Sequence, residues 1–143
     1  MSDAIPDVNS NYRRAIGITL AMFDKTLCEF EQWAHGRELH SVLYLENNRL
    51  TPSQRETILA GIQDVRRILE DCKCGLKLDT HIEDAAGYIW SQCSGLWAAL
   101  AEIGSERLKR YGEAPEGFAA YFDPHLSEVE KHLNIILDAL KKR

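Results

Sequence analysis

Residues 85–101 contain no charged side chain, and this uncharged stretch restricts the fold of the chain more than any other feature. Its large apolar residues recur at the three- and four-residue steps of an α-helix. Its opposite face carries a row of small residues at four-residue steps: Gly87, Ser91, Gly95 and Ala99. A helix on the surface of a monomeric bundle keeps one polar face, so this helix is expected to be covered on every side.

The row of small residues predicts a close contact with a second helix, because small side chains let two backbones approach each other. An uncharged row also suits contact with its own copy across a two-fold axis, where the same patch faces itself. A second uncharged stretch, residues 15–23, adds to the expected burial. We therefore predict a homodimer. The alternative is a thick monomeric core, covered by residues 39–50 and by the last inter-helix loop.

Four segments have helical periodicity, and no segment has the alternation of a strand. They span residues 10–34, 51–75, 80–112 and 123–143. The loops between them are short, which makes neighbouring helices antiparallel. The sequence thus predicts an all-α fold, an up-down-up-down four-helix bundle that forms a single domain over residues 1–143, with residues 1–9 as a flexible N-terminus.

The predicted helix ends have local signals. Thr51, Thr80 and Asp123 are the expected N-caps. The two threonines are each followed three residues later by Gln or Glu, which predicts capping boxes. Gly75 and Gly112 are the expected C-terminal stops of the second and third helices.

Residues 33–42, with the sequence WAHGRELHSV, interrupt the pattern of the first helix. The apolar stripe that reaches Ala34 would next place Arg37 and Ser41 in the core, whereas the apolar residues that follow point to another face. The helix is expected either to break near Gly36, a poor helix former, or to continue and offer its other face to a second surface.

The last inter-helix loop is unusually apolar. It contains Phe118, Tyr121 and Phe122, which are expected to fold over one end of the bundle as an aromatic plug.

The fourth helix contains a candidate metal site. His125, Glu128 and His132 are spaced i, i+3 and i+7, so they share a helix face and can bind a divalent ion, although such a row is also typical of a solvated boundary. No phosphate-binding loop or nucleophile motif is present, and the sequence predicts no catalytic residue and no cofactor.

Trp33, Trp90 and Trp97 are the candidate lining of a ligand pocket between helices, with ordinary core packing as the alternative. The net charge of −5 gives no electrostatic reason to expect nucleic acid or an anionic membrane as partner. The N-terminal residues lack the pattern of a signal peptide, and the longest uncharged run is shorter than a membrane span. A cytoplasmic location with reduced cysteines is therefore expected.

Together these features favour a non-enzymatic interaction or regulatory module, which forms a homodimer and binds a protein partner that the sequence does not identify. A small-molecule sensor that uses the tryptophans is the alternative. A metal-dependent helical enzyme that uses the histidine row is a third hypothesis.

Overall fold

The computed structural model describes residues 5–141, and within this range the fold is all-helical apart from one isolated β-bridge. The chain divides into two compact units, one up to His81 and one from Ile82 onward. None of the helices in the described range combines the length and the apolar character that crossing a bilayer requires.

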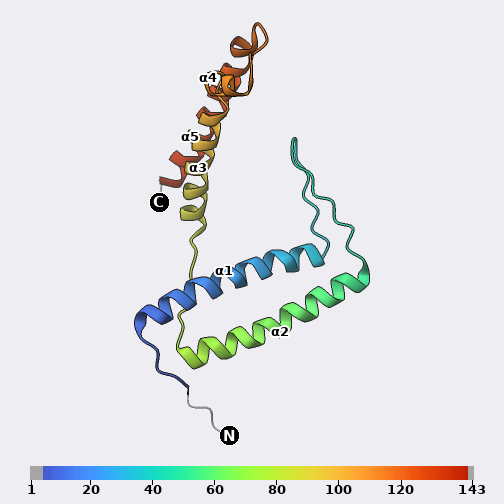
Figure 1. Ribbon diagram of the computed structural model, residues 1–143, viewed down its shortest axis with the longest axis vertical. Helices are drawn as coiled ribbons and strands as arrows, with labels where there is room; N and C mark the ends of the chain where they lie inside the picture. Colours follow the sequence, from blue (N-terminus) through green and yellow to red (C-terminus); the bar gives the residue numbers. More distant parts are fainter. Residues whose placement is uncertain (1–4, 142–143) are drawn as a thin grey trace. The chain divides into compact units, whose positions relative to one another are not determined.

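The first unit is a pair of long helices, α1 (Ser10–Ala34) and α2 (Pro52–Leu76), which run side by side in opposite directions (Figure 1). Thr51 caps α2, and its capping box with Gln54 is formed as the sequence predicts. The helix ends where Lys77 adopts the left-handed conformation, with φ 57°. Of the N-terminal segment predicted to be flexible, residues 1–4 lie outside the described range.

Arg66 fixes the register between the two helices. From α2 its guanidinium donates to both carboxylate oxygens of Glu31 on α1, at 2.8 and 3.2 Å. Its Nε atom also lies 3.9 Å from Asp24 Oδ1. Asp24 is about two helical turns before Glu31 on α1. The hydrogen bonds from Arg66 lower the pKa of Glu31, because they stabilise the ionised carboxylate more than partial desolvation disfavours it.

The second unit pairs α3 (Ala85–Glu102) with α5 (Phe118–Lys141), and the two are joined by short α4 (Ser105–Leu108) and the 3₁₀ turn η1 (Lys109–Tyr111). α5 returns along α3 (Figure 1).

The predicted ends of the third helix are wrong. α3 begins after Asp84, not Thr80, because the Asp84 carboxylate accepts the backbone N–H of Gly87 at 3.0 Å and so takes the capping role. It does not continue to Gly112 either. It ends at Glu102, just before Gly104.

The predicted start of the last helix is also wrong. α5 begins at Phe118, and Pro124 lies inside the helix instead of at its first position. Asp123 instead bonds to the start of another helix: its carboxylate accepts from the backbone N–H and the hydroxyl of Ser105, at 3.2 and 2.6 Å, at the start of α4. A contact between residues so far apart in sequence has no local signal.

The aromatic residues assigned to the last loop belong to the first turns of α5. Phe118 stacks on Phe122 with ring centroids 5.2 Å apart, while Tyr121 is 69% exposed.

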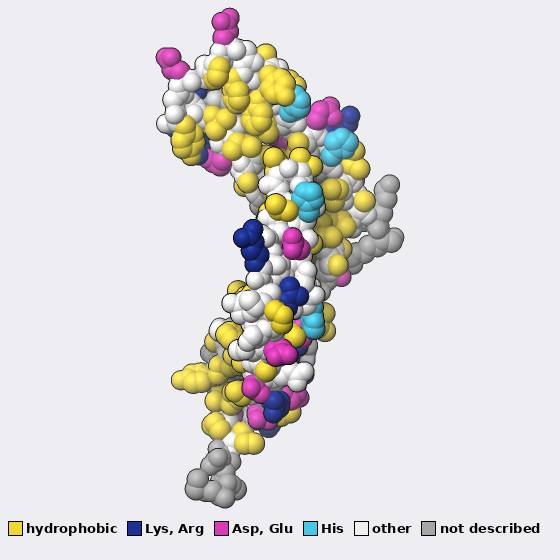
Figure 2. Space-filling view, turned by 90° about the vertical axis from the view of Figure 1, so that its right-hand side faces the viewer, with side chains coloured by type: hydrophobic (Ala, Val, Ile, Leu, Met, Phe, Trp, Pro, Cys, Tyr) yellow, Lys and Arg dark blue, Asp and Glu magenta, His cyan; other side chains and the backbone are white. Residues whose placement is uncertain are grey.

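Each unit is a helical hairpin with few buried side chains. The buried apolar residues among those described are Leu27, Ala34, Ile62 and Cys93. The chain exposes 11675 Å², whereas two separate compact units of these sizes would expose about 9,000 Å². Figure 2 shows hydrophobic side chains spread over the surface. Two packed helices cover only one side of each other, so each hairpin by itself leaves much of its apolar surface uncovered.

Candidate functional site

The segment that joins α1 to α2, residues 37–50, forms a small β-like loop that we call the connector hairpin. α1 ends at Ala34, and Gly36 follows with φ 98°, a left-handed conformation that favours glycine. A single antiparallel bridge pairs His40 with Leu45. The hairpin extends away from the ends of both helices (Figure 1).

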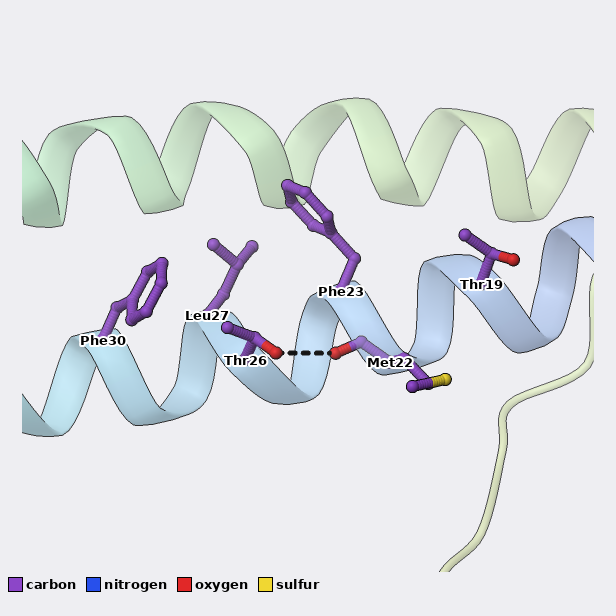
Figure 3. Close-up of a pocket in the computed structure, with 6 residues that line it drawn as sticks. All are labelled: Thr19, Met22, Phe23, Thr26, Leu27 and Phe30. Carbon is purple, nitrogen blue, oxygen red and sulfur yellow. Dashed lines mark hydrogen bonds between the residues drawn. The ribbon is translucent and has the colours of Figure 1, made fainter.

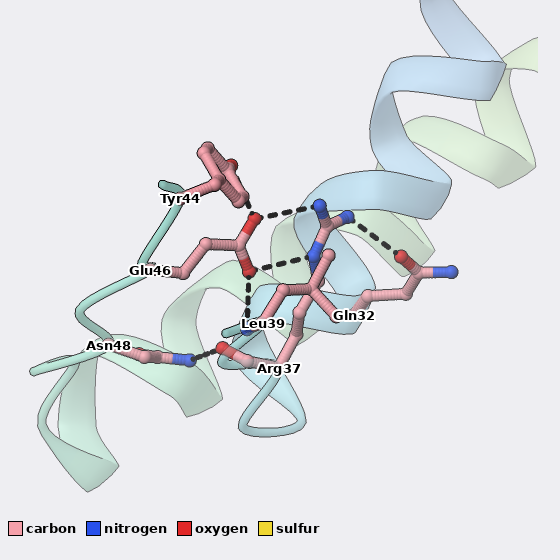
Figure 4. A network of polar contacts seen from close by, with 6 residues as sticks. All are labelled: Gln32, Arg37, Leu39, Tyr44, Glu46 and Asn48. Atoms are coloured by element: carbon pink, nitrogen blue, oxygen red, sulfur yellow. Dashed lines mark hydrogen bonds and ion pairs between the residues drawn. The ribbon is translucent and has the colours of Figure 1, made fainter. Parts of the chain in front are cut away.

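A buried carboxylate holds the base of the connector hairpin together (Figure 4). Glu46 is only 4% exposed. It accepts hydrogen bonds from Arg37 Nε and Nη2 at 3.0 and 2.8 Å, from the backbone N–H of Leu39 at 3.0 Å and from the Tyr44 hydroxyl at 2.8 Å. A buried carboxylate with four donors is fully satisfied, which makes the network a rigid anchor.

The titration of the anchor follows from this geometry. Burial by itself raises the pKa of Glu46, but the hydrogen bonds from Arg37, Leu39 and Tyr44 outweigh it, so the pKa lies below its ordinary value. The same hydrogen bond to Glu46 raises the pKa of Tyr44, because ionisation of the phenol would remove the donated proton. At neutral pH Glu46 therefore stays ionised and the Tyr44 hydroxyl keeps its proton.

A second set of contacts ties this anchor to the end of α1. Asn48 Nδ2 donates to the backbone carbonyls of Trp33 and Arg37, at 2.7 and 2.9 Å. The Arg37 guanidinium lies over the Trp33 ring, 5.2 Å from its centroid, and donates to Gln32. The base of the connector hairpin is thus fixed to the helix from which it extends.

The tip of the connector hairpin has the opposite character. Val42 and Leu43 occupy its two turn positions and are 94% and 98% exposed. Hairpin turns favour Gly, Asn or Asp, since these residues tolerate the backbone that such turns need. Neither folding nor turn chemistry therefore explains two aliphatic side chains at this position. Leu39, Tyr44 and Leu45 extend the apolar surface, with exposed fractions of 49, 57 and 67%.

A second apolar feature of the same unit is a groove on α1, which we call the α1 groove (Figure 3). It has a volume of about 300 Å³ and is lined by Thr19, Met22, Phe23, Thr26, Leu27 and Phe30. No charged side chain lines it. Thr26 donates its hydroxyl to the backbone carbonyl of Met22, at 3.1 Å, which leaves the lining largely apolar.

The small residues of the predicted interface, Gly87, Ser91, Gly95 and Ala99, are all exposed on α3. A Cβ atom built on Gly95 would meet no atom within 4 Å, so the second unit itself leaves the space beside this glycine empty. The large neighbours Trp90 and Leu96 are exposed as well, at 41 and 51%.

The three tryptophans lie in different surroundings. Trp33 belongs to the first unit and packs beneath Arg37. Trp90 and Trp97 lie on α3 in the second unit, where Lys141 Nζ lies 5.5 Å from the Trp90 ring centroid. None of the three lines the α1 groove, and the tryptophan-lined pocket stays a prediction.

The candidate metal residues are only partly brought together. His132 Nε2 lies 3.9 Å from Glu128, whereas His125 contacts the backbone carbonyl of Tyr121 at 2.6 Å. Within residues 5–141, no three histidine, cysteine or acidic side chains are grouped closely enough to hold one ion. The metal site stays a prediction without support from side-chain positions.

The connector hairpin is the feature that sequence reasoning missed. Continuing the helical stripe would have placed Arg37 in a core, and in the structure Arg37 instead forms a half-buried ion pair with Glu46. The signal was the adjacent aliphatic pair Val42–Leu43, which is unusual in a turn.

Comparison with protein-family models, with curated proteins and with solved structures found no match to this chain.

Proposed function

We propose that this protein is a non-enzymatic interaction module that works as a homodimer, with the exposed face of α3 as the contact between the copies. The observation that carries the proposal is the row from Gly87 to Ala99, which is small, uncharged and exposed on the isolated unit. The empty space beside Gly95 favours the close approach of a second helix there.

The amount of exposed surface supports the same proposal. The chain exposes roughly 2,700 Å² more than two compact units of its size would. Obligate dimers bury about 2,000–5,000 Å² counted over both partners, which is about 1,000–2,500 Å² of each chain. A large dimer interface would therefore cover most of this surface, whereas single exposed apolar residues on an ordinary monomer do not reach it.

The four-helix bundle predicted from the sequence belongs to this proposal. Two helical hairpins are the halves of such a bundle, and a bundle would cover the inner faces of α1, α2, α3 and α5. It would not cover both sides of α3, because a bundle helix keeps one face outside. The small-residue row still needs a partner, and a second copy supplies it.

We also propose that the protein works in the cytoplasm. All four cysteines, which lie in the described range, are unpaired, and this suits a reducing compartment.

Hydrogen exchange of α3 tests the contact directly. We expect the amides of residues 90–100 to be strongly protected above the dimer dissociation constant and to exchange at least about tenfold faster below it, since a covered helix opens less often. The α2 amides around Ile62 serve as the control within the same sample. Equal protection of α3 at both concentrations would contradict the proposal.

A further inference from the structure

We propose that Glu46 is an acid-sensitive switch at the base of the connector hairpin. In its ionised form the carboxylate keeps the hairpin closed, and its protonation releases the hairpin while α1 and α2 stay folded and paired. The proposal concerns the first unit alone and does not depend on the homodimer.

Few contacts besides those of Glu46 hold the hairpin closed. Two backbone hydrogen bonds join its strands, from Ser41 to Tyr44 and from Glu46 to Leu39, each 2.8 Å long. An isolated two-stranded hairpin is marginally stable at best in water. The closed form therefore depends on the four hydrogen bonds that the Glu46 carboxylate accepts at the hairpin base (Figure 4).

Protonation of Glu46 would remove the charge that Arg37 needs. The side chains of this pair are only 2% and 22% exposed, respectively. Neutralising one partner of a buried ion pair is strongly destabilising, because the other charge is left without a partner or adequate hydration. A neutral carboxyl is also a weaker acceptor for the Leu39 N–H and the Tyr44 hydroxyl than a carboxylate is. Opening the hairpin relieves both costs by returning these groups to water.

The direction of the pH dependence follows from the same contacts. Burial raises the pKa of Glu46, but the hydrogen bonds from Arg37, Leu39 and Tyr44 outweigh it and lower the pKa. The closed hairpin therefore binds a proton less readily than the open one. The stability that Glu46 gives to the closed form is complete above the ordinary pKa of glutamate, and it is lost as the pH falls through the lowered value.

The other ionisable groups near the hairpin do not explain an opening in this pH range. Arg37 and Tyr44, which bond to Glu46, keep their protonation states in acid. Among the described residues, the remaining ionisable side chains make no hydrogen bond to Glu46: Glu29 on α1, Arg55 on α2, and Glu38, His40 and Arg49 in the segment itself. His40 titrates near its ordinary pKa range of about 6.5, well above that of a carboxylate.

The helix pair has contacts of its own that survive the opening. Leu27 on α1 and Ile62 on α2 are buried. The ion pair between Glu31 and Arg66 is also lost in acid, but both of its side chains are 35% exposed, and partly exposed pairs contribute little. A longer flexible link between two paired helices costs little more, because the entropy of loop closure grows slowly with length.

Glu46→Gln tests the switch at neutral pH, because glutamine has nearly the shape of glutamate without its charge. We expect the amides of residues 41 and 46 to exchange at least about tenfold faster than in the parent when hydrogen exchange is followed by NMR. The amides around Ile62 are expected to keep their parent rates. Glu38→Gln, which removes an exposed carboxylate from the same segment, is the matched control and is expected to behave like the parent.

An acid titration of the parent tests the pH range. The NMR signals of the amides of residues 41 and 46 are expected to move to the positions of an unstructured chain below the ordinary pKa of glutamate, while the helix signals stay dispersed. In Glu46→Gln the same signals are expected to have these positions already at neutral pH.

Three results would overturn the switch. Parent-like exchange in Glu46→Gln would show that the closed hairpin does not need the charge. Equally accelerated exchange around Ile62 would show that the hairpin does not open separately from the helices. A transition near pH 6.5 would assign the opening to His40. None of these results bears on the homodimer, which the exchange of α3 tests.

Discussion

Gly95→Leu is expected to convert the dimer into a monomer while leaving the single chain at least as stable as the parent. Within its own unit, a Cβ at position 95 meets no atom within 4 Å. Replacing a glycine inside a helix also gains about 0.7 kcal/mol of helix propensity. In the dimer, by contrast, the added side chain occurs twice on the surface where two backbones are expected to meet. Overpacking of about 1–3 kcal/mol at each copy raises the dissociation constant roughly 1,000-fold.

Gly61→Leu is the matched control for this substitution. Gly61 is also an exposed helical glycine with no atom within 4 Å of a built Cβ, but it lies on α2. We expect sedimentation equilibrium to show a parent-like dimer for Gly61→Leu and a monomer for Gly95→Leu, with thermal unfolding similar in both. A Gly95→Leu protein that remains a dimer of parent affinity would show that the α3 row is not the interface.

Ile62→Ala is expected to lower the stability of the first unit by about 2–4 kcal/mol, the usual cost of truncating a fully buried aliphatic side chain. Ile62 is 3% exposed and is the buried residue that α2 contributes to the α1–α2 contact. A unit with so few buried side chains has no other layer that can collapse into the cavity. This loss is a large part of the stability of a domain of this size. Urea unfolding followed by circular dichroism measures it.

Ile68→Ala is the control on the same helix. Ile68 is 60% exposed, so its truncation is expected to change the free energy of unfolding by less than about 0.5 kcal/mol. Equal losses for both variants would mean that the exposed face of α2 is covered in solution, and that the unit alone does not describe the packing of this helix.

The sequence predicted the helices but not all of their ends. Periodicity found α1 and α2 nearly to the residue, because long apolar stripes and the local capping box at Thr51 are encoded within a few positions. The start of α5 was wrong because the expected cap, Asp123, bonds to Ser105 at the start of α4. Such an interaction depends on the tertiary arrangement, which local sequence signals do not contain.

The candidate site was predicted unevenly for the same reason. Four-residue spacing placed the small residues of α3 on one face, and all of them are exposed there. The connector hairpin depends on Glu46 reaching back to Arg37 across nine positions, so neither helical nor strand periodicity reveals it. The mismatch of phase near Gly36 showed that the backbone changes there, without showing what replaces the helix.

Native mass spectrometry of the unmodified protein, without added metal or ligand, is the most direct test of the homodimer. One spectrum reports both the number of subunits and any retained non-covalent mass. We predict two copies of the 16.3 kDa chain and no additional mass at low micromolar concentration. A monomer under these conditions would contradict the homodimer, and a monomer with an additional mass would instead favour a ligand-binding protein.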